Sequence, residues 1–276
     1  MKLIKKYFKK HRPEHLTAKG FKEPFHQSCY AAAGIAVFIF IWIVCGTFIF
    51  SRPDFEQFSG FLPGPTIKAL LTLFVDNEFW SSVIASVRRV TLGVGTALFL
   101  GLPLGLFIGY SKRAQVMTYT PIQFIRMISP LSWMPIALLI FDTFEQTIYF
   151  LITMATIWPI MLNTALGVKR VNPQWIMMAR NQGANHRQLL YLIILPASIP
   201  YILTSLRLAI GVAWIVLVPV EFLGISSGLG YIINDARDTM EYDRLMAIVL
   251  AIGVIGFILD GTIQLIQKLF HWTWVN

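Results

Sequence analysis

Residues 177–196 read MMARNQGANHRQLLYLIILP, a polar stretch with strongly apolar sequence on both sides. Its polar side chains are Arg180, Asn181, Gln182, Asn185, His186, Arg187 and Gln188. Upstream, Asn172 and Pro173 supply an N-cap and a first-turn proline for a helix. On that helix, helical spacing predicts one stripe: Trp175, Met178, Ala179 and Gln182. The pattern therefore predicts a helix, a break at Gly183, and a second short helix that Pro196 halts.

The composition shows which solvent surrounds the rest of the chain. Of 276 residues, 56% are hydrophobic and 13% are charged, and the mean hydropathy is +0.64. Because so few charges cannot cover a soluble globule of this size, the composition predicts an integral membrane protein. No linker rich in Pro, Ser or Gly divides the chain. Cys29 and Cys45 both lie in the first apolar run, and we interpret them as lipid-facing or packed thiols.

Six apolar segments are long enough to cross a bilayer, which requires about 20 residues of helix. They are residues 29–50, 82–110, 116–141, 147–168, 197–222 and 244–267. The chain is therefore expected to be an all-α polytopic membrane protein with about six transmembrane helices. It divides into a basic amino-terminal segment, residues 1–28, and a transmembrane domain, residues 29–276. A signal peptide is the alternative for the first span, but FIFSRPDFEQF, at residues 48–58, offers no small-residue cleavage site.

The Lys and Arg residues predict how the chain is oriented. The basic residues of the amino-terminal segment and of the loops after the second and fourth spans are Lys2, Lys5, Lys6, Lys9, Lys10, Arg12, Lys19, Lys22, Lys112, Arg113, Lys169 and Arg170. With six crossings all of them fall on one side, which should be the cytoplasm, together with both termini. The formal charge of +9 is then an orientation signal and not a nucleic-acid footprint. The basic tail could also touch anionic membrane lipid, although retention of topology is the simpler interpretation.

In this topology the segment 170–196 is a cytoplasmic loop between the fourth and fifth spans. A helix, a glycine break and a second helix lying on the membrane face leave room for a partner to press against them. The alternative is an interfacial amphipathic helix that only anchors the loop in lipid.

The same segment resembles a known motif, the EAA loop of ATP-binding cassette (ABC) importer permeases. That motif reads Glu-Ala-Ala, three residues, Gly, nine residues, and then Ile-x-Leu-Pro. The residues that match it at this spacing are Ala179, Gly183, Ile193, Leu195 and Pro196. Met177 and Met178 stand where the family usually has Glu and Ala, so the motif lacks its charge here.

The resemblance covers roughly residues 60–270 and points to one branch of that family, the importers of nitrate, sulfonate, taurine and bicarbonate. The segments that carry it are LPGPTIKALLTL, GLPLGLFIGYSKR, IRMISPLSWMPIALLIF, WPIMLNTALGVKRV, LPASIPYILTSLRLAIGVAW and EFLGISSGLGYII. It implies the type I ABC importer permease fold in a bacterial inner membrane. It also implies a homodimer with a second permease copy, two ATPase subunits that hold ATP and Mg, and an extracytoplasmic substrate-binding protein.

By this resemblance the segment 170–196 is the ATPase-coupling loop. The residues that the resemblance assigns to coupling are Met177, Met178, Ala179, Arg180, Gly183, Arg187, Ile193, Leu195 and Pro196. The chain has no GxxxxGK[ST] phosphate loop, so no cofactor is expected in it, and ATP hydrolysis is assigned to the separate subunits. The implied function is import of a small anion, nitrate foremost, with taurine, an alkanesulfonate or bicarbonate as alternatives.

A secondary transporter driven by an ion gradient is the alternative from another class. It would need internal repeats and acidic ion ligands within the spans. The sequence shows no repeat, and apart from Glu221 and Asp260 the spans hold almost no acidic residues. The five histidines are scattered and form no catalytic or metal-ligand pattern, so neither catalysis nor a metal site is expected in this chain.

Polar residues within the spans are the candidates for the translocation path, since an intramembrane charge is costly and usually faces a partner or a watery cavity. Arg207 and Arg126 come first, because guanidinium groups suit an anion. The weaker candidates are Ser129, Trp133, Asn163, Trp214 and Glu221. Some of these residues could instead have a structural role. Arg126 could snorkel to the cytoplasmic face, and Asn163 could bond a neighbouring helix. Glu221 could pair with a basic residue, and Arg237 is one candidate.

Overall fold

The computed structural model describes residues 23–50, 53–224 and 226–275, and every regular element among them is helical. Residues 1–22, most of the predicted basic segment, lie outside the described residues. Within the described part, five helices are long and apolar enough to cross a membrane, or six if one bent pair counts as a span. The predicted all-α polytopic fold with about six spans is confirmed.

The chain divides into two compact units, residues 1–67 and residues 68–276. The first unit contains α2 (Glu23–Phe50), the 3-10 helix η3 (Pro53–Phe61) and the first residues of α3 (Pro63–Leu73). Trp42 donates its indole N–H to the carbonyl oxygen of Phe61 at 3.1 Å, which ties η3 to α2. Most apolar side chains of α2 are exposed, as expected of a helix that lipid surrounds.

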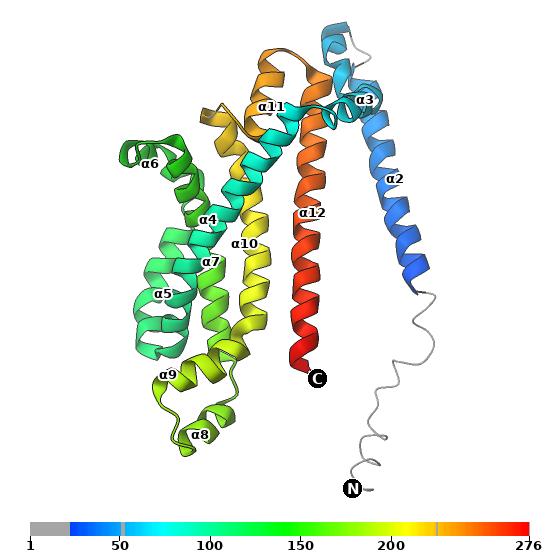
Figure 1. Cartoon of the computed structure of the whole chain (residues 1–276). Coiled ribbons are helices and arrows are strands. Elements are labelled where there is room, and N and C mark those ends of the chain that lie inside the picture. The colour runs from blue at the N-terminus through cyan, green and yellow to red at the C-terminus, as the bar shows by residue number, and fades with distance from the viewer. Residues whose placement is uncertain (1–22, 51–52, 225, 276) are drawn as a thin grey trace. The chain divides into compact units, whose positions relative to one another are not determined.

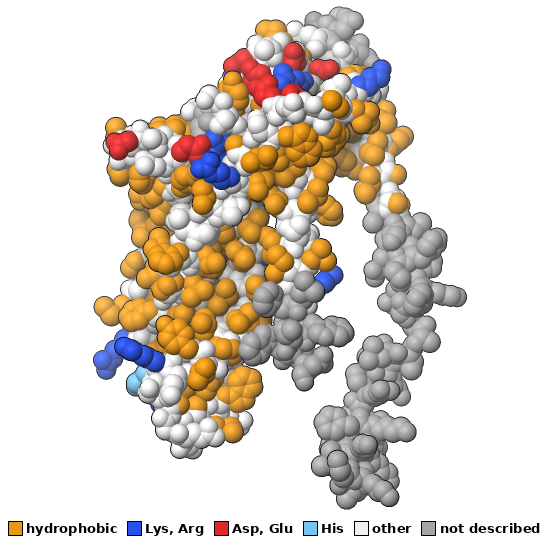
Figure 2. Space-filling model, in the orientation of Figure 1, with side chains coloured by type: hydrophobic (Ala, Val, Ile, Leu, Met, Phe, Trp, Pro, Cys, Tyr) orange, Lys and Arg blue, Asp and Glu red, His pale blue; other side chains and the backbone are white. Residues whose placement is uncertain are grey.

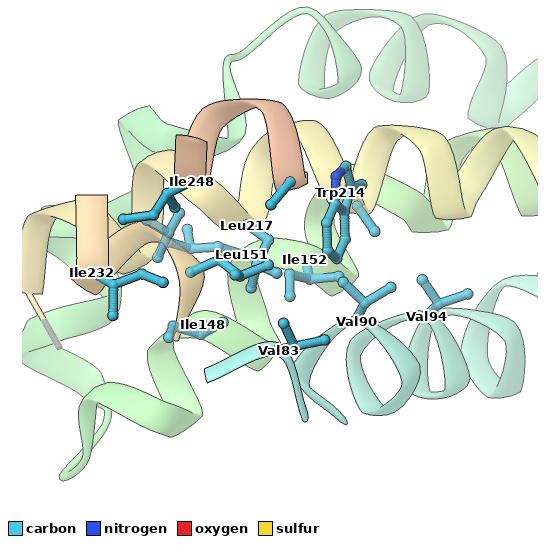
Figure 3. Close-up of a cluster of buried hydrophobic side chains, with 14 of the residues drawn as sticks. Val83, Val90, Val94, Ile148, Leu151, Ile152, Trp214, Leu217, Ile232 and Ile248 are labelled. Atoms are coloured by element: carbon cyan, nitrogen blue, oxygen red, sulfur yellow. The ribbon is translucent and has the colours of Figure 1, made fainter. Parts of the chain in front are cut away.

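The second unit is a bundle of long helices (Figure 1). These are α4 (Asn77–Tyr110), α7 (Phe144–Lys169), α10 (Leu195–Gly224) and α12 (Tyr242–Val275). α7 packs against α4 and α10, and the shorter α11 (Leu229–Asp238) packs against α10 and α12. All five helices contribute to one apolar core (Figure 3), whose members include Val83, Val90, Val94, Ile148, Leu151, Ile152, Trp214, Leu217, Ile232 and Ile248.

Small residues on α4 let α7 approach its backbone. A Cβ added at Gly105 would lie 2.5 Å from the carbonyl oxygen of Met161, and one at Gly101 would lie 3.2 Å from that of Ile157. In lipid there is little hydrophobic drive between helices, so close packing of backbones is what holds such pairs together. The glycines therefore position α4 against α7.

The predicted third span, residues 116–141, is wrong as a single helix. The segment holds α5 (Lys112–Arg126), the 3-10 turn η4 (Pro130–Trp133) and α6 (Met134–Ile140). The two halves meet at an angle of 86°. The cause is local: Ser129 precedes Pro130 and has ψ 133°, because a proline ring disfavours helical backbone in the residue before it.

The prediction that Pro196 halts the second short helix is also wrong. α9 (His186–Leu189) continues through the π-helical turn η5 (Leu190–Ile194) into α10, so one helical path runs from His186 to Gly224. Within the turn, the N–H of Leu195 donates to the carbonyl oxygen of Leu190. A π turn is wider than an α turn, so it leaves room for a proline ring that would clash with a regular preceding turn.

The two ends of this bundle differ in charge. α11 lies at one end, and α8 (Pro173–Asn181) lies with α9 at the other (Figure 1), so we call these the α11 end and the α8 end. On the face shown in Figure 2, acidic side chains gather at the α11 end, and the charged side chains at the α8 end are basic. No Asp or Glu occurs between Glu145 and Glu221, so α8 and α9 are free of acidic residues.

Candidate functional site

Local capping bonds shape the α8–α9 segment. The side chain of Asn172 accepts the N–H of Gln174 at 2.9 Å, which confirms the predicted N-cap before Pro173. Gly183 has φ +83°, a conformation that glycine adopts without the usual cost, and it ends α8. Asn185 and Gln188 then form a reciprocal capping box at the start of α9, with both bonds at 2.9 Å. The predicted helix, glycine break and second helix are confirmed.

Buried apolar side chains hold this segment on the bundle. Leu189 and Ile194 are each 1% exposed and pack with Val168 and Val171 at the end of α7. His186 Nδ1 lies 2.9 Å from the hydroxyl of Tyr110, the last residue of α4. The segment is therefore fixed to α7 and α4 at the α8 end.

The candidate coupling residues divide between two sides of this segment. Met178 and Ala179 belong to the predicted stripe, and all of that stripe lines a cavity of about 900 Å³ beside α10. Ile193 and Pro196 line the same cavity, and Leu195 is half-buried close by. Met177, Arg180, Gly183 and Arg187 are exposed and do not line it.

Three path candidates gather at the bend after α5. Arg126 is the last residue of α5, its side chain is exposed, and among the described residues it has no ion-pair partner. Ser129 is exposed and makes no capping bond, whereas Trp133 is half-buried against the core. Irregular backbone at membrane depth is tolerated where it is buried in protein or lines a watery cavity. The bend therefore offers an unpaired positive charge next to irregular backbone.

Arg207 is paired, in contrast to Arg126. Its Nε and Nη2 donate to the two oxygens of Asp260 on α12, at 2.7 and 2.9 Å. Both side chains are 40% exposed, and Gln264 donates to the same carboxylate at 2.7 Å. A guanidinium that already holds a bidentate carboxylate offers less charge to an anion. Arg207 remains a candidate for the path, but as half of a neutral pair.

Trp214 and Asn163 have structural partners. Trp214 is 8% exposed and donates its indole N–H to the carbonyl oxygen of Ile252 on α12 at 3.2 Å. Asn163 donates to the carbonyl oxygen of Pro159 at 2.9 Å, which lies one turn back on its own helix. The interpretation that Asn163 bonds a neighbouring helix is therefore wrong, because the carbonyl four residues back is within reach of a short amide side chain.

The most deeply buried charges lie near the α11 end. Arg89 on α4 is 2% exposed, and its Nη1 donates to Glu221 at 2.6 Å. The same guanidinium donates to Glu145 at the start of α7 and to the hydroxyl of Ser227. Glu221 is fully buried and also accepts bonds from Ser86 and from the N–H of Gly230. These groups join α4, α7 and α10 to the segment that leads into α11.

Glu221 does pair with a basic residue, as expected, but that residue is Arg89 and the suggested partner Arg237 is wrong. Arg237 instead donates to its neighbour Asp238 at 2.8 Å and stacks on the ring of Phe222. Arg89 was absent from the predicted site, although it lies inside the predicted span 82–110. An intramembrane charge usually needs a partner or a watery cavity, and this rule identifies Arg89 as a candidate site residue just as it identifies Arg207.

Within the described part of the chain, no group of three or more His, Cys, Asp or Glu side chains is placed to hold a metal ion.

Comparison with known proteins adds three kinds of finding. The family model described as binding-protein-dependent transport system inner membrane component matches residues 101–271. The bicarbonate transport system permease protein CmpB of Synechococcus elongatus is 34% identical over 86% of this chain and 87% of its own length. The nitrate import permease protein NrtB of Synechocystis is 31% identical over 86% and 87%. The taurine transport system permease protein TauC of Escherichia coli is 30% identical over 85% and 86%.

Solved structures provide the third comparison. A chain of the MetNI methionine ABC transporter, in inward-facing conformations, superimposes with a TM-score of 0.57. The match covers 73% of this chain and 97% of that chain at 13% sequence identity. At this identity the likeness shows a shared fold.

Proposed function

The chain belongs to the family of binding-protein-dependent transport system inner membrane components, and from that premise we propose that it conducts a small anion into a bacterial cytoplasm. Membership makes it a multi-pass permease subunit of an ABC importer. The recognition of this family from its motifs is confirmed, as is the permease fold expected from the resemblance. The proposal adds a second copy of this chain, which would complete the path, and a binding protein that delivers substrate at the α11 end.

We assign the α8 end to the cytoplasm, with both termini on that side, because its charged residues are basic. There, the exposed residues Met177, Arg180 and Arg187 would contact an ATPase subunit that holds ATP and Mg. Methionine side chains adapt to an apolar cleft, and arginines add charge contacts.

One observation carries the coupling proposal: the helical path from His186 to Gly224 is continuous. A force applied at α9 therefore acts on α10 without crossing a loop. Since a short connection with caps at Gly183 and Asn185 joins α8 to α9, a moving ATPase would tilt α10 against its neighbours.

The coupling proposal is tested with Arg180→Glu, Arg187→Glu and Gly183→Val in the full complex, co-expressed with its ATPase and binding protein. Each variant should lower ATPase copurification or ATP-driven uptake while the permease remains in the membrane. Arg237→Glu, at the α11 end, is the matched charge reversal and should retain ATPase binding. Wild-type copurification and uptake in all three α8-end variants would refute the assignment.

For the path, we propose Arg126 as the main positive contact for the anion. Its guanidinium is exposed and unpaired among the described residues, and it lies at the break of a discontinuous helix, where irregular backbone commonly lines substrate sites. Ser129 and Trp133 would border the same place. Arg207 with Asp260, and Trp214 and Asn163, would support the helices beside the path.

Arg126→Met should lower uptake per assembled complex in proteoliposomes, with unchanged thermal unfolding, because no described carboxylate loses its partner. Arg88→Met, an exposed arginine on α4, is the matched control. Uptake equal to the wild type in the Arg126 variant would remove this residue from the path.

The substrate we propose is nitrate, with bicarbonate and taurine or an alkanesulfonate as alternatives. Relatives are named as permeases for bicarbonate, nitrate and taurine, so membership of the family does not identify the substrate. Uptake of labelled nitrate, competed by each alternative with the binding protein in excess, would decide. Uptake driven by an ion gradient in the absence of ATPase would instead indicate a secondary transporter.

A further inference from the structure

We propose that the cavity between α8, α10 and α12 is a binding site for one anionic phospholipid of the membrane leaflet at the α8 end. The inference requires only that the chain spans a membrane, so it stands apart from the transported substrate and from the ATPase. The cavity has a volume of about 900 Å³ and is partly open.

The length of the cavity suits one leaflet. Its lining on the η5–α10 path runs from Leu192 to Thr204. Twelve residues of helix span about 18 Å. Half of a hydrocarbon core about 30 Å thick is about 15 Å. A single acyl chain would therefore lie along this wall from the interface to the middle of the membrane.

The polarity of the cavity suits an amphiphile. At the deep end, Thr204 donates its hydroxyl to the carbonyl oxygen of Pro200 at 2.8 Å, and Gln267 donates its amide to that of Leu203 at 2.7 Å. These polar groups are thereby satisfied within the protein. The remaining deep wall is apolar, with Ile199 among its members. This end favours hydrocarbon.

The side of the cavity next to the end of α7 carries the charge. Arg170 lies over the ring of Tyr201, 5.5 Å from its centroid, and one of its nitrogens donates to that hydroxyl at 3.3 Å. A guanidinium has five N–H donors, so most of them stay available for phosphate oxygens. Asn172 and Gln182 add amides beside it, and the lining contains no acidic residue.

The position of the charge also favours lipid over a protein partner. Arg170 ends α7 at the basic end of the bundle, where an anionic leaflet attracts Lys and Arg. Trp175 lines the same cavity, and such an amphipathic ring is typical of the headgroup level. Basic pockets between membrane helices on this side are known to suit anionic headgroups.

The test is native mass spectrometry of the purified full complex, after exchange into mixed phosphatidylglycerol and phosphatidylcholine. The wild type should retain phosphatidylglycerol in preference. Arg170→Gln should lower that retention about fivefold, the loss expected for one basic residue at an anionic surface. Arg170→Lys keeps the charge and should retain the lipid. Arg113→Gln, an exposed basic residue at the same end but outside the lining, is the matched control and should behave as the wild type.

A second pair of variants tests the acyl-chain wall. Thr204→Trp should fill the deep end and remove both lipids, whereas Leu208→Trp, one turn further on the same helix and outside the lining, should remove neither. Equal losses in Arg170→Gln and Arg113→Gln would show a general surface effect and overturn the site. Equal retention of both lipids by the wild type would overturn the anionic headgroup, and displacement by inorganic phosphate alone would assign the site to a free anion.

Discussion

Arg89 on α4 donates to Glu221 near the end of α10 at 2.6 Å, across 132 positions of sequence. The arginine side chain is 2% exposed and the glutamate side chain is fully buried. Glu145 and Ser227 complete the shell around the guanidinium. The pair thus joins the two helices that flank α7, and it does so where the chain turns toward α11.

Removing one member of this pair should destabilise the protein strongly. Arg89→Met leaves the buried carboxylate of Glu221 without its cation, which typically costs about 3–5 kcal/mol. The measurement is thermal unfolding in detergent, with folded yield as a second readout. Arg237→Met breaks an exposed pair with Asp238 and should have a far smaller effect. If both variants unfold at the same temperature as the wild type, the buried pair does not hold the helices together.

Gly228 should tolerate no side chain. It has φ +106°, and an added Cβ would lie 2.5 Å from Nη1 of Arg89 and 2.5 Å from the carboxylate of Glu221. This region of backbone conformation is nearly restricted to glycine and costs other residues about 1–3 kcal/mol. Gly228→Ala should therefore lower the unfolding temperature. Gly211→Ala, inside α10 with open space at its Cβ, is the control and should not lower it.

Close packing of α4 on α7 makes a third prediction. Gly105→Ala would set a methyl group 2.5 Å from the carbonyl oxygen of Met161, so the two backbones must separate, at a cost of about 1–3 kcal/mol. Gly95→Ala, on the same helix with nothing within 4 Å, should be neutral or gain up to about 1 kcal/mol of helix propensity. Unfolding midpoints in detergent compare the two. Equal midpoints would mean that α4 and α7 approach less closely than described.

Arg207 and Asp260 should behave as one unit. Arg207→Met leaves the carboxylate of Asp260 with Gln264 as its one donor among the described residues, so yield and unfolding temperature should fall. Arg207→Met combined with Asp260→Leu removes both charges and should restore much of the loss. Uptake per assembled complex distinguishes a structural role of the pair from a role in transport. If the folded fraction transports normally, the pair is structural. If the stable double variant shows low uptake, the pair lies on the path.

The amino-acid sequence alone was enough to predict the class of the protein and the boundaries of some of its helices. Long apolar segments predicted membrane helices, because backbone groups in lipid must bond within their own helix. Asn172 with Pro173, and Gly183, predicted where α8 begins and ends, since caps and positive φ depend on a few neighbouring residues. The spacing from Ala179 to Pro196 identified the family.

Only the tertiary structure shows which charged side chains pair and which prolines interrupt a helix. Pro130 breaks its segment and Pro196 does not, because a π turn before Pro196 accommodates the ring. The sequence does not show that Arg89 and Glu221 are partners, and only the lateral packing of α4, α7 and α10 brings them together. Local patterns reach a few residues along one helix, whereas the partner of a buried charge is set by which helix lies beside it.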